Sequence, residues 1–183
     1  MDHVKILYNQ KILKNFIIAV IGTLLLTISA KIKIPFYPVP MTMQTFVVLF
    51  FGIAFGFKLA CFTVGLYLIE GIFGLPVFSN SPEKGVGLVY FTGPTMGYLI
   101  GFMVAAFFSG YFNFKTNYIY IFVKLIISVS FIYILGLFWL GILIGWDKPL
   151  FELGAIPFLY AELFKILLLT ILTKKILKVR NFI

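Results

Sequence analysis

The sequence contains only one cysteine, one histidine and six acidic residues. A single cysteine cannot form a disulfide within the chain, so a disulfide-stabilised fold is excluded. The only histidine lies at the N-terminus, outside the apolar segments, which leaves those segments without a Cys/His metal cluster or a Ser/His or Cys/His catalytic pair. No glycine is followed by lysine, so the phosphate-binding GxxxxGK[ST] loop is absent. We therefore expect no enzyme activity, no metal and no cofactor in this chain.

The composition is that of an integral membrane protein. Apolar residues make up 62% of the chain, aromatic residues 19% and charged residues only 11%, with a mean hydropathy of +1.09. A membrane-spanning helix needs about 20 residues, so the 183 residues have room for about six. The sequence predicts an all-α integral membrane protein with one membrane domain over residues 1–183. The predicted spans are 12–30, 43–57, 59–73, 94–114, 119–145 and 155–177.

An even number of spans places both termini on one side, and the basic residues indicate which side. The segments that would share the side of the termini contain most of the lysines and the arginine. These residues are Lys5, Lys11, Lys14, Lys58, Lys115, Lys174, Lys175, Lys178 and Arg180. Cytoplasmic segments are enriched in Lys and Arg, so we expect cytoplasmic termini. The net charge of +9 then reflects topology and contact with the lipid bilayer, and it does not indicate nucleic-acid binding.

The segment 34–44 connects the first two spans and is rich in proline. Pro35, Pro38 and Pro40 fix the backbone φ angle and disfavour helix in the preceding residue, so this segment should follow a rigid extended path. A rigid segment loses little entropy when a ligand binds. We therefore interpret it as a cap over a cavity on the outer side of the membrane.

Ionisable residues within the predicted spans are candidate functional groups. Each costs about 2.5–3.5 kcal/mol at the centre of a bilayer, so it should face a cavity, a partner or an interface. Glu162 and Lys165 are three residues apart, which places them on one face of the last helix. They form either a ligand site or an ion pair that only allows the helix to insert. Glu70 lies near the outer end of its helix and is expected at the interface, while Lys124 should extend towards the inner surface.

A long segment over 75–93 contains Pro, Gly, Ser and Asn together with Phe78, Tyr90 and Phe91. This composition predicts an ordered loop that can fold over a mostly apolar ligand. Pro94 should open the next helix, whose first N–H groups are free to bind an acceptor or an anion. The alternative is a plain helix start in which Gly97 and Gly101 serve close helix packing.

Four sequence blocks together resemble one family of membrane proteins. They are PVPMTMQTF at 38–46, GLPVF at 74–78, GPTMGYLIGF at 93–102 and PFLYAELFK at 157–165. Their order and spacing resemble the biotin-binding S component family, BioY, of energy-coupling-factor (ECF) transporters. The resemblance extends over nearly the whole chain.

The resemblance implies an ECF S-component-like bundle of six helices in a prokaryotic cytoplasmic membrane. Such a receptor binds biotin from outside and has no ATPase of its own. Transport then requires a transmembrane coupling subunit and two ABC-type ATPases, which use the ATP. The family has an AxxxA motif on its first helix that packs against the coupling subunit. The corresponding residues here are Ala19 and Thr23, so threonine replaces the second alanine.

The resemblance also implies roles for particular residues. Glu162 stands where the family has an aspartate that accepts hydrogen bonds from the ureido N–H groups of biotin, and Asn80 stands where a loop asparagine meets the same ring. Lys165 would be the cation of the pocket and could face the biotin carboxylate. The remaining wall or lid contacts implied by the resemblance are Tyr98, Phe91 and Gln44.

Two other functions stay open from the sequence alone. The longer side chain of Glu162 could serve a different vitamin, such as thiamine or riboflavin, within the same architecture. The chain could also be a helical scaffold subunit with no ligand, in which the polar pair and the glycines serve packing alone. Saturable binding of one vitamin distinguishes these possibilities.

Overall fold

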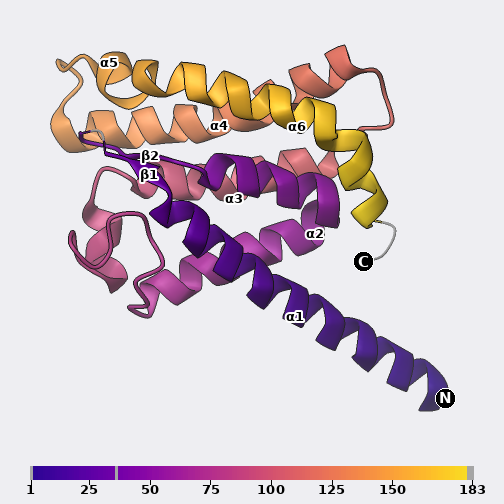
Figure 1. Cartoon of the computed structure of the whole chain (residues 1–183). Helices are drawn as coiled ribbons and strands as arrows, with labels where there is room; N and C mark the ends of the chain where they lie inside the picture. The colour runs from indigo at the N-terminus through magenta and orange to yellow at the C-terminus, as the bar shows by residue number, and fades with distance from the viewer. Residues whose placement is uncertain (1, 36, 181–183) are drawn as a thin grey trace.

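The computed structural model describes residues 2–35 and 37–180, with side chains from Gln10 onward. Phe36 in the proline-rich segment and the side chain of Lys5 therefore lie outside the described residues. The elements are α1 (Asp2–Lys31), β1 (Lys33–Ile34), β2 (Met41–Thr42), α2 (Gln44–Ile72), η1 (Gly87–Thr92), α3 (Met96–Tyr111), α4 (Tyr118–Ile144), α5 (Leu150–Gly154), η2 (Ile156–Phe158) and α6 (Leu159–Arg180). The long helices pack beside one another, and the short antiparallel β1–β2 ladder joins α1 to α2 (Figure 1).

Helix α2 changes direction at Gly56. The backbone of Gly56 has φ 75° and ψ 166°, which is not helical and which glycine adopts without steric cost. The two halves of α2 run in different directions on either side of this break (Figure 1). The sequence predicted a break at this point, and the structure confirms it. With the two halves counted separately, α1, α2, α3, α4 and α6 give the six predicted helices.

The helices have the length and composition of membrane spans. In the described part of the chain, four are long and apolar enough to cross a membrane, and they cover Gln10–Lys31, Gln44–Ile72, Tyr118–Ile144 and Leu150–Arg180. Helix α3 is apolar but shorter. It begins at Met96, two residues after the proline that was expected to open it, because Pro94 and Thr95 form a turn before the first helical residue. Multiple apolar helices make this a multi-pass membrane protein.

Glycines allow α3 to pack closely between α2 and α4. A Cβ atom on Gly101 would lie 2.6 Å from the Cα atom of Ile132 on α4, and one on Gly97 would overlap the carbonyl oxygen of Leu135. Gly110 at the other end of α3 lies against the backbone of Phe57, next to the break in α2. Gly97 and Gly101 therefore serve helix packing, as the alternative interpretation of the sequence stated.

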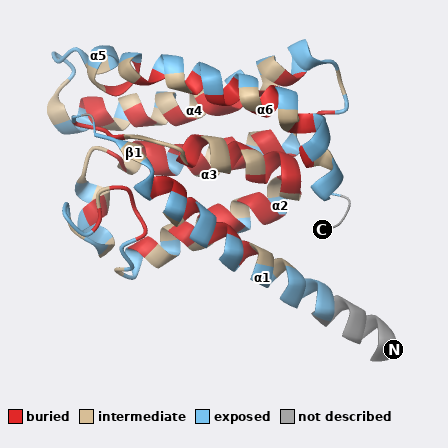
Figure 2. Ribbon diagram, viewed as in Figure 1, coloured by how far each residue is buried: buried red, intermediate tan, exposed pale blue. Residues whose placement is uncertain are grey.

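The interior of the bundle is apolar, and so is much of its surface. Leu26, Leu49, Phe51, Leu125 and Leu169 are fully buried between the helices, whereas the outer faces, such as that of α1, are exposed (Figure 2). Large exposed residues on α1 include Ile17, Ile21, Leu24 and Ile28. Because these side chains are apolar, they suit contact with lipid.

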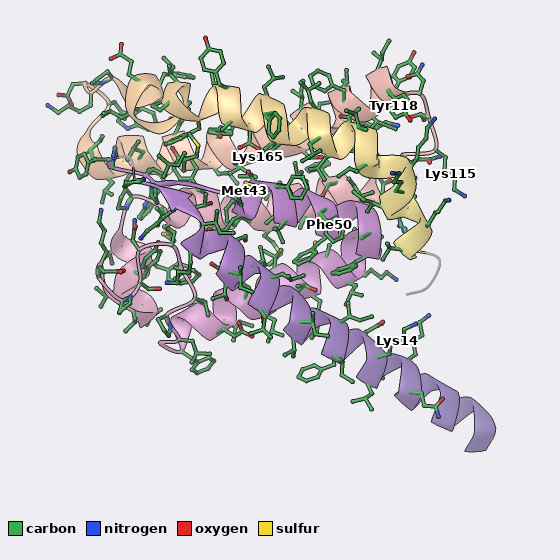
Figure 3. The ribbon with its side chains drawn as sticks, in the orientation of Figure 1. Lys14, Met43, Phe50, Lys115, Tyr118 and Lys165 are labelled. Atoms are coloured by element: carbon green, nitrogen blue, oxygen red, sulfur yellow. The ribbon has the colours of Figure 1, made fainter. Side chains whose placement is uncertain are left out.

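The two ends of the bundle differ. We call the end formed by residues 32–43, 73–95 and 145–158 the loop side, and the opposite end, which contains the break at Gly56 and residues 112–117, the terminal side. Lys14 and Lys115 lie towards the terminal side, while Met43 and Lys165 lie further into the bundle (Figure 3). Lys124 donates to the carbonyl oxygen of Asn113 at 2.6 Å, which agrees with its expected position near a helix end.

Lysines at the end of α1 fasten the loop that follows α2. The Lys31 Nζ atom donates to the carbonyl oxygens of Phe78 and Ser81 at 2.8 and 2.6 Å. Lys33 Nζ donates to the carbonyl oxygen of Ser79 at 2.7 Å. The Phe78 ring is 1% exposed and stacks on Tyr90 with ring centroids 4.7 Å apart. These contacts hold the loop over the end of the bundle.

Candidate functional site

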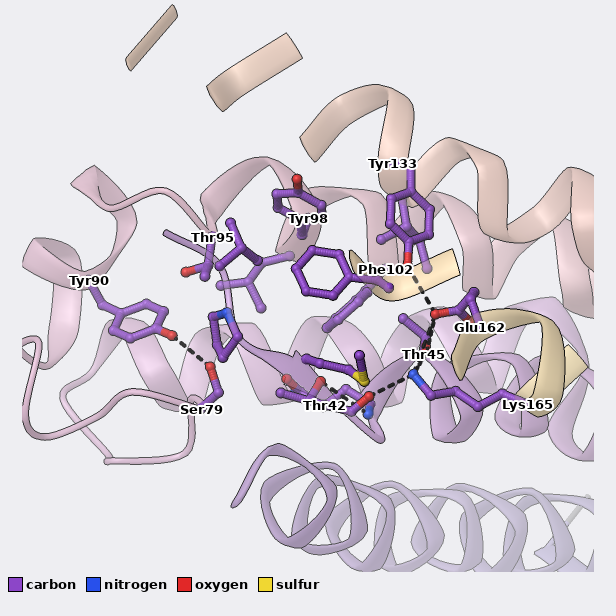
Figure 4. Close-up of a pocket in the computed structure, with 17 residues that line it drawn as sticks. Thr42, Thr45, Ser79, Tyr90, Thr95, Tyr98, Phe102, Tyr133, Glu162 and Lys165 are labelled. Carbon is purple, nitrogen blue, oxygen red and sulfur yellow. Dashed lines mark hydrogen bonds and ion pairs between the residues drawn. The ribbon is translucent and has the colours of Figure 1, made fainter. Parts of the chain in front are cut away.

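A cavity lies under the loop side of the bundle. Its wall comes from the β1–β2 connection and from α2, α3, α4 and α6, with further contributions from the loop before α3 and from η2 (Figure 4). The lining residues are Val39, Pro40, Met41, Thr42, Gln44, Thr45, Ser79, Tyr90, Thr95, Tyr98, Leu99, Phe102, Ile132, Tyr133, Phe158, Glu162 and Lys165. The proline-rich segment thus contributes directly to the wall, as predicted. The cavity volume is about 60 Å³, below the roughly 300–1,000 Å³ of typical ligand pockets, so its walls must move apart to admit a small molecule.

One end of the cavity contains a buried polar network centred on Glu162. This carboxylate is 3% exposed in the first turn of α6. Its Oε2 atom accepts a hydrogen bond from the Thr45 hydroxyl at 3.0 Å and one from the Tyr133 hydroxyl at 3.1 Å. Lys165 Nζ lies 3.4 Å from the same oxygen. The predicted pairing of Glu162 with Lys165 is therefore present, and both side chains are buried.

The two oxygens of Glu162 differ sharply. All three donors bind Oε2, while Oε1 is buried and has no hydrogen-bond partner among the described residues. Buried polar atoms in folded proteins are nearly always paired, and an unpaired carboxylate oxygen is costly. Glu162 lines the cavity, so its Oε1 atom is an unused acceptor that a ligand donor would reach once the walls move apart.

Lys165 connects α6 to the segment that caps the cavity. Its Nζ atom donates to the carbonyl oxygen of Thr42 in β2 at 2.7 Å and to the Thr45 hydroxyl at 3.0 Å, in addition to its contact with Glu162. An ammonium group has three donors. These three acceptors therefore satisfy the Lys165 ammonium within the chain.

The middle of the cavity is apolar and aromatic. Tyr98 and Phe102 lie between the two ends in Figure 4, and Met41 and Ile132 are further apolar residues of the cavity wall. The Tyr98 hydroxyl donates to the carbonyl oxygen of Gly154 at 2.8 Å, so its polar group is satisfied outside the cavity. Such a surface suits an apolar ring or a hydrocarbon chain.

The other end of the cavity, nearest the loop, is lined by hydroxyl groups. Ser79 Oγ and the Tyr90 hydroxyl oxygen lie 3.2 Å apart, and Thr95 precedes the first turn of α3 (Figure 4). The cavity is thus polar at both ends and apolar between them. It therefore complements a molecule with two separated polar groups and an apolar middle.

The structure places four of the six predicted ligand contacts in the wall of the cavity. These are Glu162, Lys165, Tyr98 and Gln44. Gln44 is 3% exposed, and its Nε2 atom donates to the Tyr67 hydroxyl at 2.7 Å, which orients it within the core.

Asn80 and Phe91 are not among the residues that line this cavity, so their predicted contact with a ligand stays a prediction. The side-chain oxygen of Asn80 accepts a hydrogen bond from Lys33 Nζ at 3.2 Å. Its neighbour Ser79 lines the cavity instead. The Phe91 ring packs edge-on against Phe78, with ring centroids 5.4 Å apart, and so stabilises the loop.

The structure also turns the predicted partner motif on α1 inward. Ala19 is fully buried and Thr23 is 2% exposed. The Thr23 hydroxyl donates to Oε1 of Glu70 on α2 at 2.9 Å. In this conformation both residues are buried, Thr23 faces the second half of α2, and neither offers a free surface to another subunit. The bond also explains how Glu70 is accommodated between two apolar helices.

Three polar residues of the site do not stand out in the sequence. Thr42 and Thr45 lie within the proline-rich block and look like ordinary turn and helix-start residues. Tyr133 lies near the middle of α4, where an aromatic residue is expected to pack. For Tyr133 the sequence does contain an indication, because a tyrosine hydroxyl near the middle of a membrane helix needs a hydrogen-bond partner. In the structure, Glu162 is that partner.

Loosening the loop should speed ligand exchange. In a Lys31→Met variant, the carbonyl oxygens of Phe78 and Ser81 lose their donor. We expect the loop to open more often and the ligand to dissociate about three- to tenfold faster, since these are charge-assisted bonds at a partly exposed site. Hydrogen–deuterium exchange of residues 78–85 and a dissociation assay measure this. Lys84→Met is the matched control, because the Lys84 ammonium in the same loop lies over the Tyr37 ring. Equal hydrogen–deuterium exchange of residues 78–85 in the two variants contradicts the prediction.

A helical membrane bundle with a cavity under its loop side, polar at both ends, has the architecture of a receptor for a small solute. Comparison with solved structures gives the same class. The chain matches the crystal structure of the S component for biotin from an ECF-type ABC transporter with a TM-score of 0.76 and 25% identity, over 93% of each chain. The family model of the BioY family matches residues 3–182, so this chain belongs to the BioY family.

Two curated relatives support the family membership. The probable biotin transporter BioY of Pyrococcus horikoshii is 34% identical over 77% of this chain and 82% of its own. The biotin transporter BioY of Thermotoga maritima is 32% identical over 91% of this chain and 97% of its own. The predicted S-component fold is therefore confirmed by both sequence and structure.

Proposed function

We propose that this chain is the biotin-binding S component of an ECF transporter, which captures biotin at its loop side for uptake. The observation that carries the proposal is the unpaired, buried Oε1 atom of Glu162 in a cavity with an apolar middle. Biotin has two ureido N–H donors at one end, an apolar bicycle and chain, and a carboxylate at the other end. The names of the matching relatives support the same ligand.

The polar network explains how the ureido ring would be bound. Oε1 of Glu162 accepts a ureido N–H bond, while Thr45, Tyr133 and Lys165 hold the other oxygen in place. Charge-assisted hydrogen bonds in a dry site contribute about 1.5–3 kcal/mol each. The site residues we assign to ligand binding are Glu162, Lys165, Tyr98 and Gln44, with Asn80 and Phe91 supporting the loop.

Transport requires energy from other proteins. Members of this class are subunits of a transporter and not enzymes themselves. We propose that the partners are a transmembrane coupling subunit and two ABC-type ATPases, which hydrolyse the ATP. The membrane is the prokaryotic cytoplasmic membrane, with both termini inside and the loop side outside. The basic residues Lys58, Lys115 and Lys174, which belong to the terminal side, support this orientation.

The burial of Ala19 and Thr23 restricts how α1 can contact the coupling subunit. Ala19 and Thr23 can reach a partner only if α1 moves away from α2, which requires the bond between Thr23 and Glu70 to break. The alternative contact surface is the exposed apolar face of α1. Crosslinking from cysteines placed at Ala19 and at exposed Ile21 distinguishes the two surfaces.

Ligand titration tests the proposed function. The purified protein should bind biotin tightly and saturably, and thiamine and riboflavin should not compete. Trp139 is a suitable reporter, because its Nε1 atom donates to the carbonyl oxygen of Gly93, two residues before Thr95 in the cavity wall. Binding of thiamine or riboflavin instead of biotin would keep the receptor architecture and overturn its specificity. Absence of binding by all three vitamins would favour the scaffold function.

A further inference from the structure

A long groove lies between α4 and α6 on the outer surface of the bundle. Its volume is about 990 Å³, much larger than that of the cavity under the loop side. The two helices run side by side (Figure 1), and α5 contributes to the wall of the groove. Among the described residues, Tyr133 and Glu162 alone line both spaces, so they form the wall between them. The groove is therefore a second space beside the cavity.

The groove faces lipid and is lined mainly by apolar side chains. Ile134 and Phe138 on α4 and Leu159 and Leu163 on α6 line it, and each is between 46% and 58% exposed. These residues lie in two helices that have the length and composition of membrane spans. At this depth an empty volume loses dispersion contacts, and an apolar wall offers water few hydrogen-bond partners. Hydrocarbon is therefore the material that fills the groove.

The groove extends to the loop side of the bundle and ends before the terminal side. On α4 its lining runs from Phe138 to Ile126, a stretch of about 18 Å at roughly 1.5 Å per residue. Nearer the terminal side, the Lys174 ammonium of α6 lies 4.3 Å from the centroid of the Tyr118 ring of α4 and joins the two helices. One leaflet of the hydrocarbon core is about 15 Å deep, whereas a membrane-spanning helix needs about 30 Å. The groove therefore fits an acyl chain from the leaflet at the loop side, and it is too short for a spanning helix of another subunit.

The loop end of the groove carries groups that suit a lipid headgroup. Trp146 lines this end, is 62% exposed and packs against Phe138 with ring centroids 5.8 Å apart. Tryptophan is enriched at the level of the headgroups. Beside it, Lys148 Nζ lies 3.3 Å from Oδ2 of Asp147, and both side chains are exposed. Lys148 also lines the groove, so an ammonium and a carboxylate stand together at its rim.

These charges match a headgroup that carries both signs. An ammonium binds phosphate, and a carboxylate binds a primary ammonium. An exposed ion pair contributes little, so Lys148 and Asp147 can exchange their mutual contact for these partners at small cost. Glu152 is a second carboxylate in the wall of the groove. Two carboxylates near one ammonium disfavour a headgroup with a net negative charge.

We infer that the groove between α4 and α6 binds one phospholipid of the leaflet at the loop side, whose headgroup carries a phosphate and a primary amine. An acyl chain lies along Phe138 and Leu163. The phosphate binds Lys148, and the amine binds Asp147. Phosphatidylethanolamine has this chemistry. The inference does not depend on the ligand proposed for the cavity.

Native mass spectrometry of the whole, delipidated chain tests the inference. The protein is titrated with phosphatidylethanolamine and, separately, with phosphatidylglycerol that has the same acyl chains. We expect one phosphatidylethanolamine to bind with a dissociation constant about fivefold below that of phosphatidylglycerol, which corresponds to one exposed ion pair. Asp147→Asn should reduce this difference to less than about twofold, and Lys148→Gln should weaken the binding of both lipids.

Filling the groove should remove the site. Leu163→Trp places a bulky ring in the path of the acyl chain and should weaken phosphatidylethanolamine binding by about fivefold or more. Leu167→Trp is the matched control, because Leu167 lies on the same helix, is also 46% exposed and does not line the groove. Its lipid binding should be unchanged. If Leu163→Trp does not fold, Ile134→Trp on the facing wall is measured by the same criterion.

Two results overturn the inference directly. They are equal lipid binding by the two tryptophan variants, and equal dissociation constants of the two lipids for the unmodified protein. A protein dimer in the native spectrum that Leu163→Trp abolishes and Leu167→Trp retains would show that a second copy of the chain occupies the groove, and this also overturns the inference.

Discussion

Replacing Glu162 by alanine should weaken biotin binding by about a hundredfold. The change removes the buried Oε1 atom, which we propose accepts a ureido N–H bond, and such a bond contributes roughly 1.5–3 kcal/mol. It also leaves the buried Lys165 ammonium without its anion, and breaking a buried ion pair on one side is costly. Isothermal titration of the purified variant with biotin measures the loss.

The control for this variant is Glu152→Ala. Glu152 is an exposed carboxylate in α5 and does not line the cavity, so its removal should leave the affinity unchanged. Glu162→Asp retains the charge with one methylene fewer, and we expect a smaller loss than in the alanine variant. An alanine variant with unaltered affinity and intact folding would show that Glu162 and Lys165 are only a structural pair.

Replacing Gly110 by alanine should strongly destabilise the bundle, although the change adds only one methyl group. A Cβ atom at this position would overlap backbone atoms of Phe57, and backbone cannot move aside as a flexible side chain can. Overpacking of this kind costs about 1–3 kcal/mol, and we expect the upper end because the contact is at the break in α2. The midpoint of thermal unfolding should fall by about 5–10 °C in a fluorescence-detected aggregation assay.

Gly65→Ala is the matched control for the packing prediction. A Cβ atom on Gly65 would meet only the terminal methyl group of Met103 at 3.3 Å, and that group can rotate away. Its midpoint should change little. Equal midpoints for the two alanine variants would show that the contact of α3 with the break in α2 is not a close-packed one.

Much of the fold could be predicted from the sequence, because the membrane imposes strong constraints. Long apolar runs and the glycine at position 56 each have a direct physical meaning, and the structure confirms both. The first residues of the helices were predicted less accurately than their number. Helix α3 begins at Met96 and not at the expected Pro94, because a proline is compatible both with the first helical turn and with the turn before it.

From residue chemistry alone, without the family resemblance, the candidate site was predictable only where charge was involved. Glu162 and Lys165 stand out because ionised groups are expensive in a membrane. Thr45 and Tyr133 are common residues whose roles depend on how three helices meet, and no local pattern shows that. Ser79 lines the cavity and its neighbour Asn80 does not, because loop geometry decides which of two adjacent side chains reaches the cavity.

The depth of the cavity has a consequence for the electrical work of transport. Ile132 and Tyr133 line the cavity and lie near the middle of α4, so the site reaches about halfway across the layer of spans. A charge that crosses the whole membrane potential gains or loses about 2.3 kcal/mol per 100 mV. A monoanionic ligand bound here has therefore already entered part of the electric field. With a negative cell interior, that field opposes inward movement of the anion, so its delivery requires an energy source and should become harder as the membrane potential grows.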